Sequence, residues 1–188
     1  MLAERREALR NALNDPDEQV RQAAAGALEQ IELLGELDDL LRQAAEGARG
    51  ERVKALFALE KARSDRVYPV LLQALDDEDA DLRAAAVQVL GRRHHPPTLK
   101  AVLKCLKDPE PAVRVHAAAA LGYFGDRRLI PYLVAVLKAR DDALACAAID
   151  ALARIGDPAA EEHLLTVLHD PRSKVRVAAA EALGRLDF

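Results

Sequence analysis

The sequence of 188 residues contains little of what several protein classes depend on. It has only two cysteines, Cys105 and Cys146, 41 positions apart, which fits two small core side chains better than a disulfide framework. Aromatic residues make up only 3% and tryptophan is absent, a composition typical of close-packed helices rather than of a sheet. No stretch approaches the roughly 18 apolar residues of a membrane span, and the N-terminus lacks a signal peptide's apolar segment. We therefore expect a cytoplasmic location.

Groups that carry catalysis are also scarce. Ser64, Thr98 and Ser173 have no His-Asp pair beside them, and no glycine-rich phosphate loop occurs. His94 and His95 are adjacent, but no cysteine, histidine or carboxylate set of zinc spacing surrounds them, so they fit an exposed, rigid turn. We expect no enzyme activity, no catalytic residues, no metal and no cofactor.

The net charge of −4 and the pI near 5.8 argue against wholesale binding to nucleic acid. The charge is uneven. Residues 1–94 carry 14 Lys/Arg and 19 Asp/Glu, a net −5, whereas residues 95–188 carry 13 and 12, a net +1.

A repeat of 31 residues runs through the whole chain. Leucine recurs at this spacing, and an alanine precedes each leucine by four residues, at Leu28, Leu59, Leu90, Leu121, Leu152 and Leu183 and at Ala24, Ala55, Ala86, Ala117, Ala148 and Ala179. Such a period is typical of stacked repeat proteins. We predict one domain, 1–188, with units of roughly 1–32, 33–63, 64–94, 95–125, 126–156 and 157–188.

Each unit contains two apolar patterns of helical spacing separated by a polar turn. Asp and Pro before the second pattern suit a helix start, and glycines such as Gly35, Gly125 and Gly156 are expected to mark the return turns. Unit two is irregular, because Glu51 occupies a column that elsewhere holds Val or Leu. The pattern predicts an all-α solenoid of six two-helix units.

Residues 108–122 (DPEPAVRVHAAAALG) and 170–184 (DPRSKVRVAAAEALG) resemble HEAT repeats. The short unit is similar to the HEAT-like repeats of the phycobilisome-lyase type. The resemblance implies a right-handed superhelix, a concave face lined by the second helices, and an Asp–Arg ladder between turns. It covers nearly the whole chain but says little about function, because the family includes scaffolds and chromophore-attachment factors.

The ladder has a counterpart in two columns of this sequence. Arginine occurs at Arg21, Arg52, Arg83, Arg114 and Arg176, and an acid occurs in the turn at Asp15, Glu46, Asp77, Asp108 and Asp170. Unit five lacks both, having Ala145 and Ala139. Their joint absence indicates that the two columns interact, and a structural role is favoured over a ligand-facing one.

Candidate partner-binding residues lie between the core columns of the second helices. An apolar floor and a basic rim with a central tyrosine are expected, from Val53, Phe57, Lys61, Arg92, Val115, His116, Tyr123, Arg154 and Arg185. Exposed apolar rows usually mark contacts, and a basic rim suits an acidic helix or tail. The alternative is a quiet alanine surface with solvated arginines.

We therefore favour a non-catalytic protein-interaction scaffold. One alternative, implied by the resemblance, is a subunit or chaperone-like factor of an enzyme assembly such as a bilin lyase. Another is nucleic-acid binding along the basic rim, which the net negative charge and scarce aromatics disfavour. The last unit keeps apolar columns, and Leu186 and Phe188 close the chain. A free end normally carries a polar cap, so we expect either self-association through this repeat or a natural chain that continues further.

Overall fold

The computed structural model describes the backbone of residues 2–186 and all their side chains except those of residues 2, 3, 33 and 34. Phe188 lies outside this part. The described residues contain eleven α-helices and four short 3₁₀ segments. The α-helices are α1 Leu2–Ala12, α2 Glu18–Glu46, α3 Arg49–Ala58, α4 Val67–Ala74, α5 Ala80–Arg93, α6 Leu99–Lys104, α7 Pro111–Tyr123, α8 Ile130–Leu137, α9 Asp142–Ile155, α10 Pro158–Val167 and α11 Ser173–Leu183. The 3₁₀ segments are η1 Leu59–Lys61, η2 Pro96–Thr98, η3 Cys105–Lys107 and η4 Arg127–Leu129.

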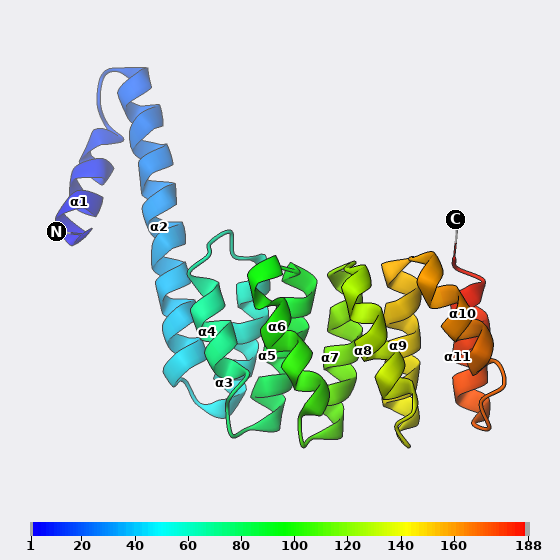
Figure 1. Ribbon diagram of the computed structural model, residues 1–188. Helices are drawn as coiled ribbons and strands as arrows, with labels where there is room; N and C mark the ends of the chain where they lie inside the picture. The colour runs from blue at the N-terminus through cyan, green and yellow to red at the C-terminus, as the bar shows by residue number, and fades with distance from the viewer. Residues whose placement is uncertain (1, 187–188) are drawn as a thin grey trace.

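From the second half of α2 onward, the helices stand side by side in one row of antiparallel pairs (Figure 1). The first helices α4, α6, α8 and α10 form one layer, and the second helices α3, α5, α7, α9 and α11 form the other. The predicted all-α solenoid is confirmed. Contacts between consecutive second helices are more extensive than those between consecutive first helices. Because a two-layer array curves toward its more closely packed layer, the second helices lie on the inner face.

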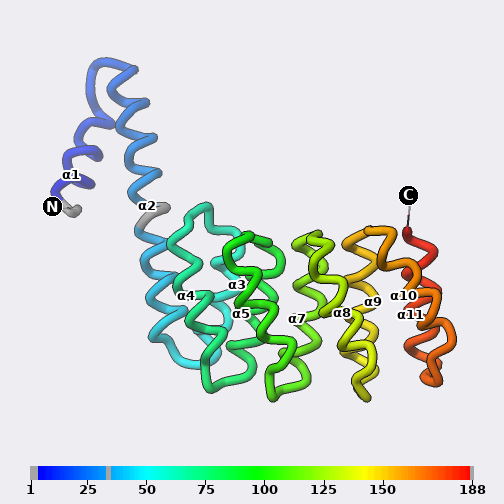
Figure 2. The backbone as a smooth tube through the Cα atoms, in the orientation of Figure 1, coloured from blue at the N-terminus to red at the C-terminus, as the bar shows by residue number. Residues whose placement is uncertain are grey.

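The first unit departs from the row. The backbone tube shows α1 and the first half of α2 standing away from the other helices (Figure 2). The expected return turn at Gly35 is wrong, because α2 is continuous from Glu18 to Glu46. Gly125 and Gly156 have positive φ and are each followed by an Asp that caps the next 3₁₀ or α-helix. Gly35 has no such cap after it, and one glycine costs a helix only about 1 kcal/mol.

This projecting hairpin leaves parts of the expected core columns uncovered. Leu13 and Val20 are 38% and 40% exposed, although Ala24, Leu28 and Ile31 of the same hairpin are buried. No later unit packs on that end of α2, so the outermost positions of the columns have no neighbour to bury them.

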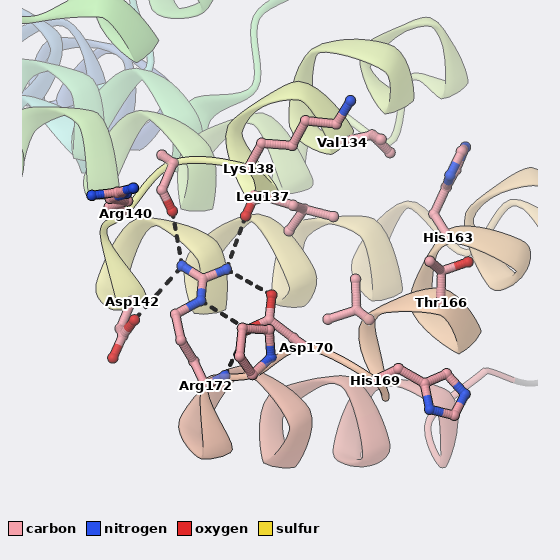
Figure 3. Close-up of a pocket in the computed structure, with 13 residues that line it drawn as sticks. Val134, Leu137, Lys138, Arg140, Asp142, His163, Thr166, His169, Asp170 and Arg172 are labelled. Carbon is pink, nitrogen blue, oxygen red and sulfur yellow. Dashed lines mark hydrogen bonds and ion pairs between the residues drawn. The ribbon is translucent and has the colours of Figure 1, made fainter.

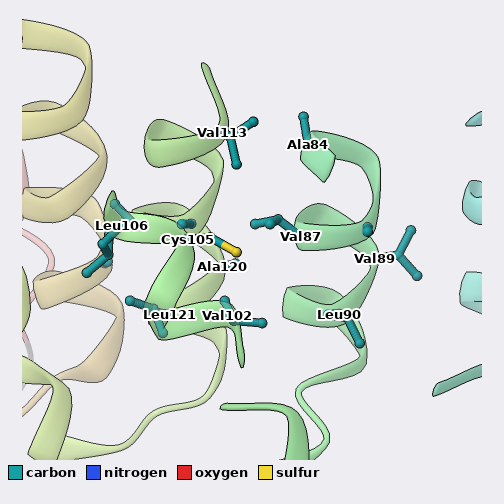
Figure 4. Close-up of a cluster of buried hydrophobic side chains, with 14 of the residues drawn as sticks. Ala84, Val87, Val89, Leu90, Val102, Cys105, Leu106, Val113, Ala120 and Leu121 are labelled. Carbon is teal, nitrogen blue, oxygen red and sulfur yellow. The ribbon is translucent and has the colours of Figure 1, made fainter. Parts of the chain in front are cut away.

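The core of the row follows the repeated columns. Leu59, Leu90, Leu121 and Leu152 are fully buried, and Ala86, Ala117 and Ala148 are fully buried beside them. Figure 4 shows how Val87, Leu90, Leu106 and Val113 fill the space between neighbouring units. Small residues decide how closely these units approach.

Gly91 and Gly122 allow the closest of these approaches. They lie in the last turns of α5 and α7. A Cβ at Gly91 meets the Ala120 Cβ at 2.5 Å, and one at Gly122 meets the Ala151 Cα at 2.8 Å. The left-handed residue that ends α5 is instead His94, with φ 36°.

Glu51 does not enter the core of unit two. Its side chain is exposed at the third position of α3, and its Oε2 accepts a hydrogen bond from the Ala48 backbone N at 3.1 Å. A carboxylate that caps a helix start suits the positive end of the helix dipole. The helix therefore begins without the Asp-Pro turn of the other units.

Candidate partner-binding surface

The arginine column holds the turns of the repeat together. In each of four units the Nη1 of the column arginine donates to two backbone carbonyls of its own turn, at distances of 2.7–3.0 Å. These arginines are Arg21, Arg83, Arg114 and Arg176. The turn acid of the same units accepts from a backbone N two residues further on. The column is thus bonded to backbone and is not free to meet a ligand.

Three arginines of the column also reach an acid of the next unit, and for Arg52 and Arg83 this is the column acid, as the joint pattern predicts. Asp141, the partner of Arg114, lies two residues beyond the column position that Ala139 holds in unit five. The pairs are Arg52–Asp77 at 2.6 Å, Arg83–Asp108 at 2.9 Å and Arg114–Asp141 at 3.7 Å. Arg83 and Asp108 are only 12% and 8% exposed, and two parallel hydrogen bonds of 2.9 Å join them. The Arg83 guanidinium holds the pKa of Asp108 below its usual value.

Unit five, which lacks the column arginine, has its turn capped from unit six. Arg172 donates to the carbonyl oxygens of Leu137 and Ala139 at 3.0 and 2.8 Å, and it pairs with Asp170 at 2.8 Å (Figure 3). Asp141 accepts from Leu144 N and so caps α9. Arg172 crosses one wall of a cavity of about 820 Å³ between units five and six.

The apolar floor of the inner face is shallower than the sequence indicates. Val53, Phe57, Val115 and Cys146 are each partly buried and pack against the core, so they form no exposed row. Val177 of α11, at the position equivalent to Val53 and Val115, is the exposed one, at 57%.

The basic rim is partly neutralised by acids from adjacent positions. Arg92 pairs with Glu60 at 2.6 Å, and Asp150 accepts from both Arg154, at 3.1 Å, and Arg185, at 2.8 Å. Lys61, in η1, is exposed. Three of the four rim cations thus share two carboxylates, which leaves the rim with a net positive charge. Sequence reasoning missed these partners, although the Asp150–Arg154 spacing of four residues is a direct signal.

Tyr123 and His116 lie about two helical turns apart on α7, near the middle of this face. Tyr123 is 43% exposed, and the Arg154 guanidinium lies 4.5 Å from its ring centroid. Partial burial, with a smaller contribution from Arg92, lowers the pKa of His116, which favours the neutral imidazole. The structure therefore places an aromatic ring, a neutral histidine and paired arginines along one side of the row.

The histidine pair does not form the fully exposed turn that the sequence indicates. His95 stacks on Tyr68 with ring centroids 4.0 Å apart, and Arg93 lies 4.9 Å from the same tyrosine centroid. His94 is exposed. Within residues 2–186, no group of three or more His, Cys, Asp or Glu side chains is placed to hold a metal ion.

Neither cysteine has the environment of a nucleophile. Cys105 is 7% exposed, and burial raises the pKa of its thiol to about 11. Burial also raises the pKa of Cys146, to which the negative charge of Asp142 adds. No helix among the described residues has the length and apolar character needed to cross a membrane.

These features define an α-solenoid with an extended, mildly basic inner face. A model of HEAT repeats matches residues 38–110, 68–145 and 130–187, and a single-repeat HEAT model matches residues 6–32. The chain therefore belongs to the HEAT-repeat family. No curated protein matches it significantly in sequence.

Solved structures share this fold. A chain of the CpcE–CpcF complex of phycocyanin lyase from Nostoc matches with a TM-score of 0.68 and 24% identity, over 80% of this chain and 64% of that one. A designed armadillo repeat protein in complex with the peptide (KR)4 matches with a TM-score of 0.62 and 18% identity, over 96% and 98% of the two chains. The Escherichia coli protein YibA matches with a TM-score of 0.58 and 22% identity, over 98% and 69%. At these identities the likeness concerns architecture alone.

Proposed function

We propose that this protein is a non-catalytic scaffold that binds an acidic protein surface or helix on its inner face. The observation that carries the proposal is the net positive rim beside exposed Tyr123 and Val177. Aromatic and arginine side chains are enriched where proteins bind one another. The partly buried floor residues Val53, Phe57 and Val115 supply apolar contact beneath them. A cytoplasmic location is part of this proposal.

The test is affinity capture from a lysate of the source organism, with identification by mass spectrometry. The wild type is compared with a variant in which Lys61, Arg92, Arg154 and Arg185 become glutamate. A protein retained by the wild type alone, and released as salt rises, supports the proposal. Equal capture by both removes the rim from the binding site.

Charge reversal also breaks the pairs with Glu60 and Asp150, so a second comparison isolates the apolar part. Val177→Asp changes one exposed side chain on the inner face and leaves all rim pairs in place. We expect about a tenfold loss of affinity if Val177 lies in the interface. Circular dichroism shows whether each variant keeps its helix content.

A role as a subunit of an enzyme assembly is the second candidate, supported by the structural match to a chain of the phycocyanin lyase complex. This chain spans only 64% of that chain. The protein is mixed with a bilin and with each captured partner, and the absorption spectrum is recorded. A red or blue shift that needs both proteins supports this role, whereas an unchanged spectrum supports the plain scaffold.

Self-association through the last repeat is proposed as well. Leu165 of α10 is 48% exposed, and Leu186 packs only partly against the core. Sedimentation equilibrium over a hundredfold concentration range gives the mass. A mass that rises toward that of a dimer, and that Leu165→Glu returns to the monomer value, supports the contact. A constant monomer mass refutes it.

A further inference from the structure

A second surface lies on the outer layer, between the first helices of units four and five. The side chains of α6 with η3 and of α8 border a groove of about 330 Å³. Three lysines, Lys100, Lys104 and Lys107, stand along one side of it, and Tyr132 and Val136 line the other. Tyr132 is 51% exposed, although the chain has few aromatic residues with which to build its core.

The charge of this surface runs against that of the chain. Residues 99–107 and 130–138 contain four lysines and no aspartate or glutamate, although the net charge of the protein is −4. Within the part of the chain that the structure describes, the three groove lysines form no ion pair. The nearby Asp108 is bonded to Arg83, and neither Asp108 nor Asp76 lines the groove.

The spacing of the lysines favours one kind of occupant. Positions i, i+4 and i+7 place them on one side of the segment, each about 6 Å from the next along its axis, because the last step runs through the 3₁₀ segment η3. Carboxylates at the same spacing on a partner helix match this row. Leu103 and Val136 are partly buried between the lysines and Tyr132 and offer an apolar floor. A polyanion without apolar side chains leaves that floor uncovered.

We propose that this groove binds an acidic amphipathic peptide segment of a protein partner. Its carboxylates contact Lys100, Lys104 and Lys107, and its apolar side chains cover Leu103, Tyr132 and Val136. The site lies in the outer layer, opposite the inner face assigned above, and does not depend on that assignment. A scaffold with both surfaces holds two partners at once.

The test is selection of a displayed library of random 16-residue peptides on the full chain. Peptides with acidic residues beside apolar residues at helical spacing are expected to be enriched. Each enriched peptide is then synthesised with a fluorescent label, and its affinity is measured by fluorescence anisotropy. We expect the triple variant K100E/K104E/K107E to weaken binding at least about tenfold, and Tyr132→Ser to weaken it by a similar factor.

The control variant R10E/R63E/K174E makes the same change in net charge at exposed basic residues outside both proposed surfaces and leaves binding unchanged. Because all six basic residues are exposed, circular dichroism should report folded protein for both triples. The proposal is overturned if the enriched peptides are not acidic and amphipathic, or if K100E/K104E/K107E binds them as tightly as the wild type does. Tighter binding of single-stranded DNA or anionic vesicles through the same lysines also overturns it.

Discussion

The Arg83–Asp108 pair offers the sharpest test of how neighbouring units hold together. Asp108→Asn keeps the shape of the side chain and an oxygen that accepts from Glu110 N, but it removes the negative charge. Arg83 then keeps a buried guanidinium without the counter-charge at position 108, while its bonds to the carbonyls of Asp77 and Glu78, at 2.9 and 3.0 Å, remain. The substitution thus isolates the ion pair from the turn.

Removing one partner of a buried ion pair typically costs 3–5 kcal/mol, since the other charge stays buried. The two remaining carbonyl bonds favour the lower end of this range. We expect the free energy of unfolding to fall by about 3 kcal/mol, measured by urea unfolding followed by circular dichroism. Asp38→Asn is the control, because Asp38 and its partner Arg66 are 57% and 56% exposed. That change should cost less than about 1 kcal/mol.

The effect has a pH dependence of fixed sign. Arg83 depresses the pKa of Asp108 in the folded state, so the stabilisation is complete above the pKa of an unfolded aspartate, about 3.9. It disappears as the pH falls below that value through the folded pKa. The gap between wild type and Asp108→Asn should therefore close in acid. Equal costs for Asp108→Asn and Asp38→Asn at neutral pH refute the assignment of a buried, stabilising pair.

Three further predictions concern packing and reactivity. Gly91→Ala should lower the free energy of unfolding by about 1–3 kcal/mol through overpacking. Gly26→Ala, with open space around the added Cβ, should raise it by about 0.5–1 kcal/mol. If urea unfolding shows that both substitutions change this free energy in the same direction, the close approach at Gly91 is contradicted. Amide exchange should be faster at residues 44–53, where Glu51 replaces a core residue, than at the equivalent residues of unit four, and equal protection contradicts this. Cys105 should stay unreactive toward DTNB at neutral pH while Cys146 reacts slowly; rapid labelling of Cys105 in folded protein argues against its burial.

The repeat columns predict the stacked part of the fold well, because burial is decided position by position in units of equal length. Leu90, Leu121 and Leu152 occupy equivalent sites and are equally buried. The continuation of α2 through Gly35 depends on a small balance between a glycine penalty and a missing cap. A difference of about 1 kcal/mol decides that junction, and column matching does not weigh it.

The candidate surface was predictable in position but not in charge. Equivalent positions put Arg92, Arg154 and Tyr123 on one side of the row, as the structure has them. The carboxylates that pair with the rim arginines depend on how each unit is displaced relative to the unit before it. Arg92 meets Glu60, 32 residues earlier, and Arg185 meets Asp150, 35 residues earlier. Reading each column alone pairs residues 31 apart and so misses these diagonal contacts.

The contact of Arg172 with the turn of unit five bears on how this array can gain or lose units. Arg114 and Arg83 cap their own turns, so their units carry the parts needed to close. Unit five depends on unit six, because Leu137 and Ala139 are capped by Arg172 alone of the arginines described. Deletion of residues 157–188 leaves the preceding turn open to water. Units five and six can therefore be gained or lost only as a pair without leaving a turn uncapped.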